Sequence, residues 1–296
     1  MVILQKNSYM NKLQRFFSDN WTIQRHEFEN TVSLLLPCII NGNIDAATAQ
    51  LNKEKCTIKA TSSPYMAAWY ELDDITLPVN SIAVINLTGV LYSWESEWVI
   101  RQVEAAELNR NICGIVFVID GPGGMVSHLD MAATSVENCT KPTATVVTGI
   151  MASAHFWLGT ASDRTFIASP LCEVGSVGIV VTHYSFKRFF EQAGIDYREI
   201  YPDTADLKNK ETRALVDNND ESLIKAKAEK IHKVFSETVA RHLGIEYDPE
   251  LPLFRGEMFD GNEAVAAGYI DQFGGVADAV KWVLAKAMSR KADELY

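Results

Sequence analysis

The chain has 296 residues, which is enough for two domains or for one large α/β domain with an extension. Apolar residues make up 47% and charged residues 22%, so a disordered, collagenous or coiled-coil protein is excluded. The chain carries 27 basic against 38 acidic residues, a net charge of -11. This charge would repel a phosphate backbone or an anionic membrane, so we expect no nucleic-acid partner.

Cysteine usage and the N-terminus bear on the cellular compartment. The five cysteines lie far apart and include no Cys-x-x-Cys pair, so neither a disulfide framework nor a zinc site is indicated. We expect a reducing, cytoplasmic location, no metal and no cofactor. The N-terminus has only a short apolar run, and no stretch approaches the roughly 18 apolar residues of a spanning helix, so we expect no signal peptide and no membrane anchor.

The first part of the chain differs in character from the rest. Residues 1–78 mix short amphipathic stretches with loop punctuation such as Pro37, which predicts a small, mostly helical N-terminal extension of unknown role. After residue 78, β-branched apolar runs alternate with helical patterns. This alternation predicts βαβ units and a parallel sheet buried on both faces, within a domain of residues 79–296. The strands are expected at 81–91, 114–119 and 143–148, and the helices at 95–109 and 125–138.

The second half of the chain continues the α/β pattern. Strands are expected at 164–168, 175–181 and 197–200, and helices at 185–193, 220–243 and 276–289, with a short helix after Gly261 that Gly268 closes. The polar segment 201–213 has no apolar periodicity and predicts a flexible loop that leads into the long helix.

A glycine-rich turn follows the second strand of this domain. The sequence Asp-Gly-Pro-Gly-Gly at 120–124 connects a buried strand to a helix. Gly123 and Gly124 let the chain approach a ligand closely, and free N–H groups at such a turn can hold a developing oxyanion. A tight turn without a ligand explains the same residues. The Gly-x-Gly-x-x-Gly fingerprint of dinucleotide-binding proteins is absent.

A serine follows the next strand in the same way. Ser153 lies between the strand at 143–148 and an apolar helical stretch, where a nucleophile would be exposed to substrate. A helix N-cap is the more common role of serine at such a position. No Gly-x-Ser-x-Gly elbow is present, and His155 is a poor candidate for the base of Ser153 because it is only two residues away along the chain. A lysine whose pKa is lowered by burial is the other way to activate serine, and Lys208 or Lys210 could fill that role.

The order of these motifs resembles the signal peptide peptidase A family of serine-lysine peptidases. The resemblance covers residues 82–283 and rests on the Pro-Gly-Gly turn, the Ala-Ser-Ala around Ser153, the Val-Gly-Ser-Val-Gly around Ser176, a lysine-bearing loop and a closing Glu-Ala-x-x-x-Gly-Tyr-x-Asp. The phage-type branch that acts in prohead and capsid maturation is the most similar. It shares the short N-terminal extension, the Pro-Gly-Gly-Met-Val turn and the lack of a membrane anchor.

The resemblance implies a fold, a mechanism and partners. The fold would be the α/β ββα spiral of Clp protease and crotonase with a parallel sheet, in a homo-oligomeric ring. Ser153 would be the nucleophile, Lys208 the general base and Ser176 the hydroxyl that orients the lysine, with Gly123 and Gly124 forming the oxyanion hole. The substrate would be a polypeptide such as a capsid or scaffold protein, cleaved in prohead and capsid maturation or in proteolysis like that of signal peptide peptidases but independent of a membrane. A phage-encoded chain would act in the host cytoplasm or the immature capsid.

Two departures from the family pattern stand out. His155 adds bulk beside the nucleophile, where family members commonly have small residues. In the base loop, a gapless alignment places Asp206 at the lysine position; an insertion of two residues brings Lys208 there, and Lys210 needs two more. Two alternatives therefore stay open: a non-catalytic shell or scaffold-binding protein that retains the fold, and a crotonase-like acyl-CoA enzyme that uses the oxyanion turn without a nucleophile.

Overall fold

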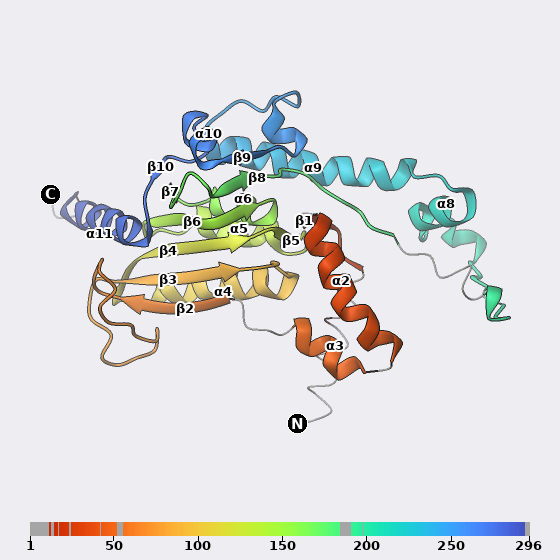
Figure 1. Cartoon of the computed structure of the whole chain (residues 1–296), viewed down its shortest axis with the longest axis horizontal. Helices are drawn as coiled ribbons and strands as arrows, with labels where there is room; N and C mark the ends of the chain where they lie inside the picture. The colour runs from red at the N-terminus through yellow and green to blue at the C-terminus, as the bar shows by residue number, and fades with distance from the viewer. Residues whose placement is uncertain are drawn as a thin grey trace.

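A mixed sheet runs through the middle of the molecule and carries helices on both faces (Figure 1). The computed structural model describes residues 12, 15–16, 18–23, 25–41, 43–51, 56–183, 191–196 and 198–293. Within this part of the chain the sheet has eight strands, in the order β10-β7-β6-β4-β3-β2, with β8 paired to β6 and β9 paired to β8. A separate two-stranded sheet joins β1 to β5.

The strands are β1 (Trp21–Ile23), β2 (Cys56–Thr61), β3 (Ser81–Thr88), β4 (Ile112–Gly121), β5 (Gly123–Met125), β6 (Thr143–Ala152), β7 (Arg164–Ile167), β8 (Glu173–Gly175), β9 (Met258–Asp260) and β10 (Gln272–Phe273). The helices are α2 (Arg25–Ile40), α3 (Ile44–Leu51), α4 (Ser93–Leu108), α5 (Leu129–Glu137), α6 (Ala154–Gly159), α8 (Lys210–Asn218), α9 (Ser222–Leu243), α10 (Gly261–Ala266) and α11 (Val276–Asp293). Short 3-10 helices η1 (Asp203–Ala205) and η2 (Pro252–Arg255) complete the description.

Most neighbouring strands are parallel. The pairs β3–β4, β4–β6, β6–β7, β7–β10 and β6–β8 run parallel, whereas β2–β3 and β8–β9 run antiparallel. Parallel strands require crossover connections, and α4, α5 and α6 supply them between β3, β4, β6 and β7. The sequence prediction of an α/β protein with a parallel sheet is confirmed.

The central strands bury alternate residues on opposite faces of the sheet. Ile82 and Val84 of β3 pack in the cluster under α11, together with Val280 and Val283. Their neighbours along β3 pack in the larger cluster on the other face, which α4, α5, α6 and α9 cover. Because both faces are covered, the strands consist of almost continuous apolar runs, as the sequence showed.

The helices and strands agree with the sequence predictions over most of residues 79–296. The main differences lie between β8 and α9. Residues 198–200, expected as part of a strand, have no regular structure, and helix α8 begins at Lys210, within the polar segment expected as a loop. The strand expected at 175–181 is not formed: β8 ends at Gly175, where that range begins, and beyond it only Val180 makes an isolated bridge, to Trp21. The predicted helix at 185–193 lies mostly outside the described residues.

The sheet begins before residue 79. Strand β2 pairs antiparallel with β3 over Cys56–Leu87 to Thr61–Ile82, so it belongs to the main sheet although it lies in the segment assigned to the extension. Its first four residues alternate between partly buried and exposed, which suits an edge position, and its last two are buried. The division at residue 78 stays a prediction.

The N-terminal elements form a second core against the body of the protein. Rings of Phe16, Trp21 and Phe28 pack together with centroids 5.0–5.9 Å apart, and Trp21 also lies edge-on to Tyr92 at 6.4 Å. Met125 of β5 belongs to the same cluster. Figure 1 shows β1 and α2 (red) beside β5, so this unit covers the carboxyl ends of the central strands.

Three properties of the described residues concern sites and location. No helix there is both long and apolar enough to cross a bilayer. No group of three His, Cys, Asp or Glu side chains in that part of the chain could hold a metal ion. All five cysteines are free thiols.

His242 near the end of α9 connects that helix to the rest of the body. Its Nδ1 lies 3.2 Å from the Thr160 hydroxyl, and its Nε2 lies 3.6 Å from Glu137. Burial, and then the charge of Arg241, lowers the pKa of His242 from 6.5 to about 4. The folded state therefore prefers the neutral ring.

Acid should destabilise the fold through this histidine. Between the ordinary pKa of 6.5 and about 4 the unfolded chain binds a proton that the folded chain does not, so the free energy of unfolding falls as pH falls. We expect a loss of roughly 2 kcal/mol between pH 7 and pH 5. Urea unfolding at both pH values checks this; a His242→Gln variant should show a smaller loss, and an equal loss would assign the effect to other groups.

Candidate active site

The site is built around the residue that follows strand β6. Strand β6 ends at Ala152, and Ser153 connects it to α6 with φ 57° and ψ -114°. A positive φ is uncommon for a residue with a side chain and indicates local strain that the surrounding structure holds. The Ser153 N–H donates to Gly175 O at 2.8 Å, and its side chain makes no capping bond to α6. The N-cap alternative therefore does not explain the hydroxyl.

Ser176 lies next to Ser153 because β8 pairs with the end of β6. The parallel register aligns Ala152 with Gly175, so the following residues, Ser153 and Ser176, leave the two strands side by side. Ser176 also has a positive φ of 54°, and its N–H donates to Glu257 O at 2.8 Å. Two serines on strained backbone thus meet at one sheet edge.

The glycine turn after β4 forms the other wall of the site. Gly123 has φ 114°, and a Cβ at this residue would lie 3.0 Å from Ser153 Cβ and would overlap Thr22 O. A Cβ on Gly124 would overlap the backbone of Leu91. Only glycine fits at these positions, because the chain's own backbone crowds both of them. The role of the turn toward a ligand stays a prediction.

His155 lies behind the glycine turn. It is 1% exposed, and its Nδ1 accepts a hydrogen bond from Gly123 N–H at 3.1 Å. An accepting Nδ1 carries no proton, so the neutral ring has its proton on Nε2. In this structure the Gly123 N–H is therefore engaged by the ring rather than directed at a substrate oxygen.

A threonine of the N-terminal strand lies on the candidate nucleophile. The hydroxyls of Thr22 and Ser153 are in contact, and Thr22 Oγ1 also lies 2.8 Å from Gly178 O. A carbonyl can only accept, so the Thr22 proton points to Gly178 and Ser153 donates to Thr22. Ser153 is 1% exposed as a result.

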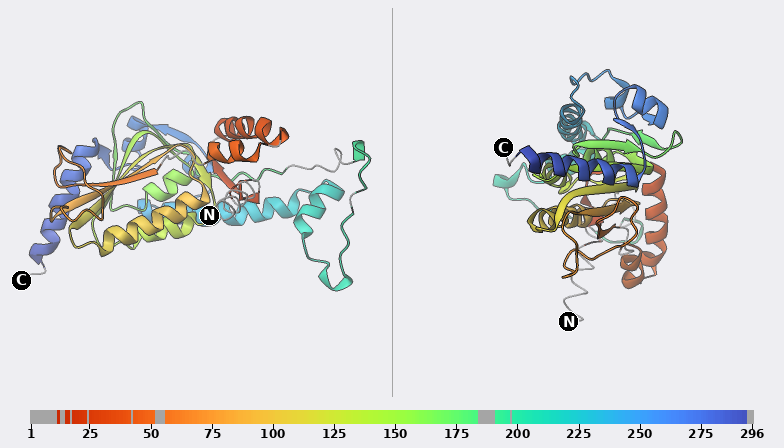
Figure 2. Two further views of the ribbon diagram at one scale, coloured as in Figure 1. Left: turned by 90° about the horizontal axis from the view of Figure 1, so that it is seen from below. Right: turned by 90° about the vertical axis from the view of Figure 1, so that its left-hand side faces the viewer.

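The predicted base lies elsewhere in the same chain. Lys208 and Lys210 are exposed: Lys208 lies between η1 and α8, and Lys210 is the first residue of α8. This segment projects away from the sheet beyond the N-terminal end of α9, as Figure 1 and the left view of Figure 2 show. One copy of the chain thus brings together Ser153, Ser176, Gly123 and Gly124 but not the lysines.

Sequence reasoning missed Thr22 and the role of His155. The β1–β5 pair joins residues about a hundred positions apart, and the three residues of β1 carry no motif. The sequence indicates His155 as a poor base for Ser153 and as added bulk beside it, whereas in the structure its ring accepts a hydrogen bond from the backbone of the turn. A histidine two residues after the serine gave no sign of that contact.

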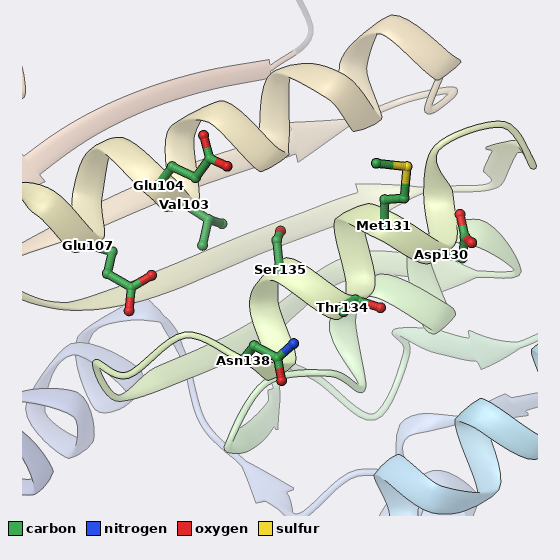
Figure 3. Close-up of a pocket in the computed structure, with 8 residues that line it drawn as sticks. All are labelled: Val103, Glu104, Glu107, Asp130, Met131, Thr134, Ser135 and Asn138. Carbon is green, nitrogen blue, oxygen red and sulfur yellow. The ribbon is translucent and has the colours of Figure 1, made fainter.

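A depression elsewhere on the surface contains none of the predicted site residues. Figure 3 shows it between α4, which contributes Glu104 and Glu107, and α5, which contributes Asp130 and Met131 among other residues. Its acidic rim and exposed methionine form a surface groove that the site described above does not use.

The fold and the site define an α/β protein with a strained serine at the carboxyl end of a parallel strand, beside a glycine turn. The chain belongs to peptidase family S49, whose model matches residues 136–289, slightly more than half of its length. A Clp protease model also matches residues 70–174. The resemblance seen in the sequence is confirmed.

The relatives include phage and cellular proteins. The chain is 22% identical to the head-tail preconnector protein GP5 of Enterobacteria phage P21, over 85% of this chain and 53% of that protein. It is 23% identical to the capsid assembly protease C of Escherichia phage lambda, over 68% of this chain and 48% of that protein. The chloroplastic serine protease SPPA of Arabidopsis thaliana is 23% identical over 65% of this chain and 28% of that protein.

The chain spans about half the length of the phage relatives it matches. Among solved structures, a ClpP1 mutant from Listeria monocytogenes superposes with a TM-score of 0.45 at 15% identity, over 67% of this chain and 94% of that one.

The glycine turn gives a stability prediction that does not depend on activity. Gly124→Ala places a Cβ against the Leu91 backbone, which is fixed by hydrogen bonds to Gly123 and Met125, so the turn must shift. We expect the free energy of unfolding to fall by about 1–3 kcal/mol. The matched control is Gly275→Ala, which meets open space and should change little. Equal stability of the two variants in urea would contradict the crowded turn.

Proposed function

We propose that the chain is a cytoplasmic serine endopeptidase in which Ser153 attacks the peptide bond. The observation that carries this proposal is the strained Ser153 at the end of β6, in contact with the Gly123 turn and without a capping role. Membership of family S49 supports the reaction class. It also leaves the acyl-CoA alternative without support, because that chemistry has no use for a nucleophilic serine.

The substrate class is proposed from the relatives and from the site. Two of the matched proteins are named for phage capsid assembly or the head-tail connection, so a capsid or scaffold polypeptide is the proposed substrate. A polypeptide in extended form fits a site that is bordered by a strand, because main-chain hydrogen bonds to a sheet edge bind extended chains.

The lysine is proposed to act across subunits. The segment with Lys208 projects from the body, and its neighbour Leu207 is poorly covered, being 68% exposed. We call this projecting segment, from residue 201 to the end of α8, the arm. A groove between the arm, the start of α9 and residues 181–183 is lined by Leu215, Val216 and Ile224, among others. A neighbouring copy that covers this arm would exclude water from Lys208 and bring its amine to the neighbour's Ser153 and Ser176.

A second function has a specific observation in its favour. The lysines lie apart from Ser153, and Thr22 covers it, so a non-catalytic shell or scaffold-binding protein with this fold would show the same single-chain geometry. Reactivity of Ser153 separates the two functions.

Ser153→Ala should abolish peptide cleavage and labelling by a serine-directed phosphonate, with little effect on folding. The hydroxyl makes no capping bond, so the expected loss of stability is about 1 kcal/mol or less. Mass spectrometry of the labelled, digested protein locates the adduct. Ser135→Ala on α5 is the control that should keep full activity; turnover above a few per cent in Ser153→Ala would exclude this nucleophile.

The base is tested by substitution and by mixing. Lys208→Ala and Lys208→Arg should both eliminate cleavage, since a guanidinium keeps its proton, whereas Lys210→Ala should keep most of it. The rate should rise with pH, because the neutral amine is the active form. If Lys210→Ala eliminates cleavage and Lys208→Ala keeps most of it, Lys210 is the base instead.

Mixing then asks whether the dyad crosses subunits. Ser153→Ala and Lys208→Ala chains, each inactive, should regain activity when they assemble together, at roughly one quarter of the sites in a random ring. Activity should also fall cooperatively on dilution. If native mass spectrometry shows mixed oligomers but cleavage activity does not return, the serine and the lysine of a site must come from one chain.

A further inference from the structure

Strand β1 occupies the edge where an extended polypeptide would meet Ser153. It runs antiparallel to β5 with Thr22 opposite Gly124 and Ile23 opposite Gly123. On its other edge, Trp21 exchanges two backbone hydrogen bonds with Val180, at 3.1 and 2.8 Å. The strand is therefore paired on both sides, between the glycine turn and the segment that follows β8.

The side chains of β1 alternate between the nucleophile and an apolar pocket. Thr22 faces Ser153 and Gly178, and it is fully buried. Trp21 and Ile23 point the other way and belong to the cluster with Tyr92 and Met125. Trp21 is 2% exposed, so its ring anchors the strand.

We propose that β1 is a built-in occupant of the substrate groove that holds the isolated chain in a closed state. The inference rests on the proposed peptidase function for the identity of the groove, and adds that residues 21–23 must leave before a substrate binds. Thr22 blocks the Ser153 hydroxyl, and the paired edges leave no free strand position on either side of β1.

The same geometry predicts which polypeptides the groove accepts. A polypeptide that replaces β1 would pair with β5 and with Val180, place a small side chain against Ser153 and place a large apolar side chain in the Tyr92 and Met125 pocket. Substrates with a small residue that follows an aromatic residue should therefore be preferred.

Covalent linkage explains why a free substrate would compete poorly. A tethered strand acts at an effective concentration on the order of millimolar, so a micromolar peptide cannot displace it unless the strand is weakened. Weakening the Trp21 anchor should open the groove. The ion pair between Arg15, just before β1, and Glu97 of α4 is too exposed to hold the strand in place by itself.

The test uses two full-length variants that act on β1 in different ways. Trp21→Ala removes the anchor, and Thr22→Glu places a carboxylate in a buried position that cannot accommodate it. Leu36→Ala, on the exposed side of α2 in the same N-terminal unit, is the matched control. Circular dichroism establishes that each variant is folded.

Two readouts are measured: the rate of phosphonate labelling at Ser153, and the binding of a fluorescent peptide with the sequence of residues 18–26. Both β1 variants should label at least tenfold faster than the unmodified chain and should bind the peptide, whereas Leu36→Ala should match the unmodified chain. Equal labelling and equal binding in all four proteins would overturn the inference. If no protein labels but only the β1 variants bind the peptide, the occupied groove stands and the proposed catalytic function falls.

The unmodified chain provides a further measurement should both variants misfold. Local release of β1 exposes the Val180 N–H without unfolding the sheet, so this amide should exchange with solvent at least tenfold faster than the Val146 N–H of β6. Exchange of both amides only through global unfolding would mean that β1 never leaves, and would also overturn the inference.

Discussion

The pairing of β6 with two different strands is the constraint on which the site depends. β7 pairs with β6 over Ala144–Val147, and β8 pairs with it over Ile150–Ala152. The second pairing continues into the hydrogen bond from Ser153 N–H to Gly175 O, which holds the serine backbone at a positive φ. Without β8, the Ser153 N–H would lose this hydrogen-bond partner and Ser176 would not be placed beside Ser153.

The strained serine and the glycine turn come together because parallel strands end at one edge of a sheet. β4 and β6 are neighbours, so the turn after β4 lies against the residue after β6. The edge that results is an open template for an extended chain, and the protein's own β1 fills it. The placement of the candidate nucleophile and its coverage by β1 thus both depend on the residues that follow β4 and β6.

Much of this architecture was readable in the sequence because it rests on local patterns. The apolar runs of β3, β4 and β6 identify a buried parallel sheet, and the Pro-Gly-Gly turn and Ser153 follow two of those strands directly. The contact of Thr22 with Ser153 was not readable, because it depends on a pairing between residues far apart in the chain and on a three-residue strand with no periodicity. The position of Lys208 was not readable either, since a polar segment without a repeating pattern gives no orientation.

The two pairings of β6, with β7 and with β8, also differ in how much sequence change they tolerate. The branch through β7 and β10 joins the core under α11, where the packing of Phe166 and Val280 leaves little freedom for change. The branch through β8 and β9 is short, and irregular chain follows β8. Insertions and substitutions there can reshape one wall of the groove while the main sheet stays intact. A fold built in this way can acquire new peptide preferences without rebuilding the framework that carries its serine.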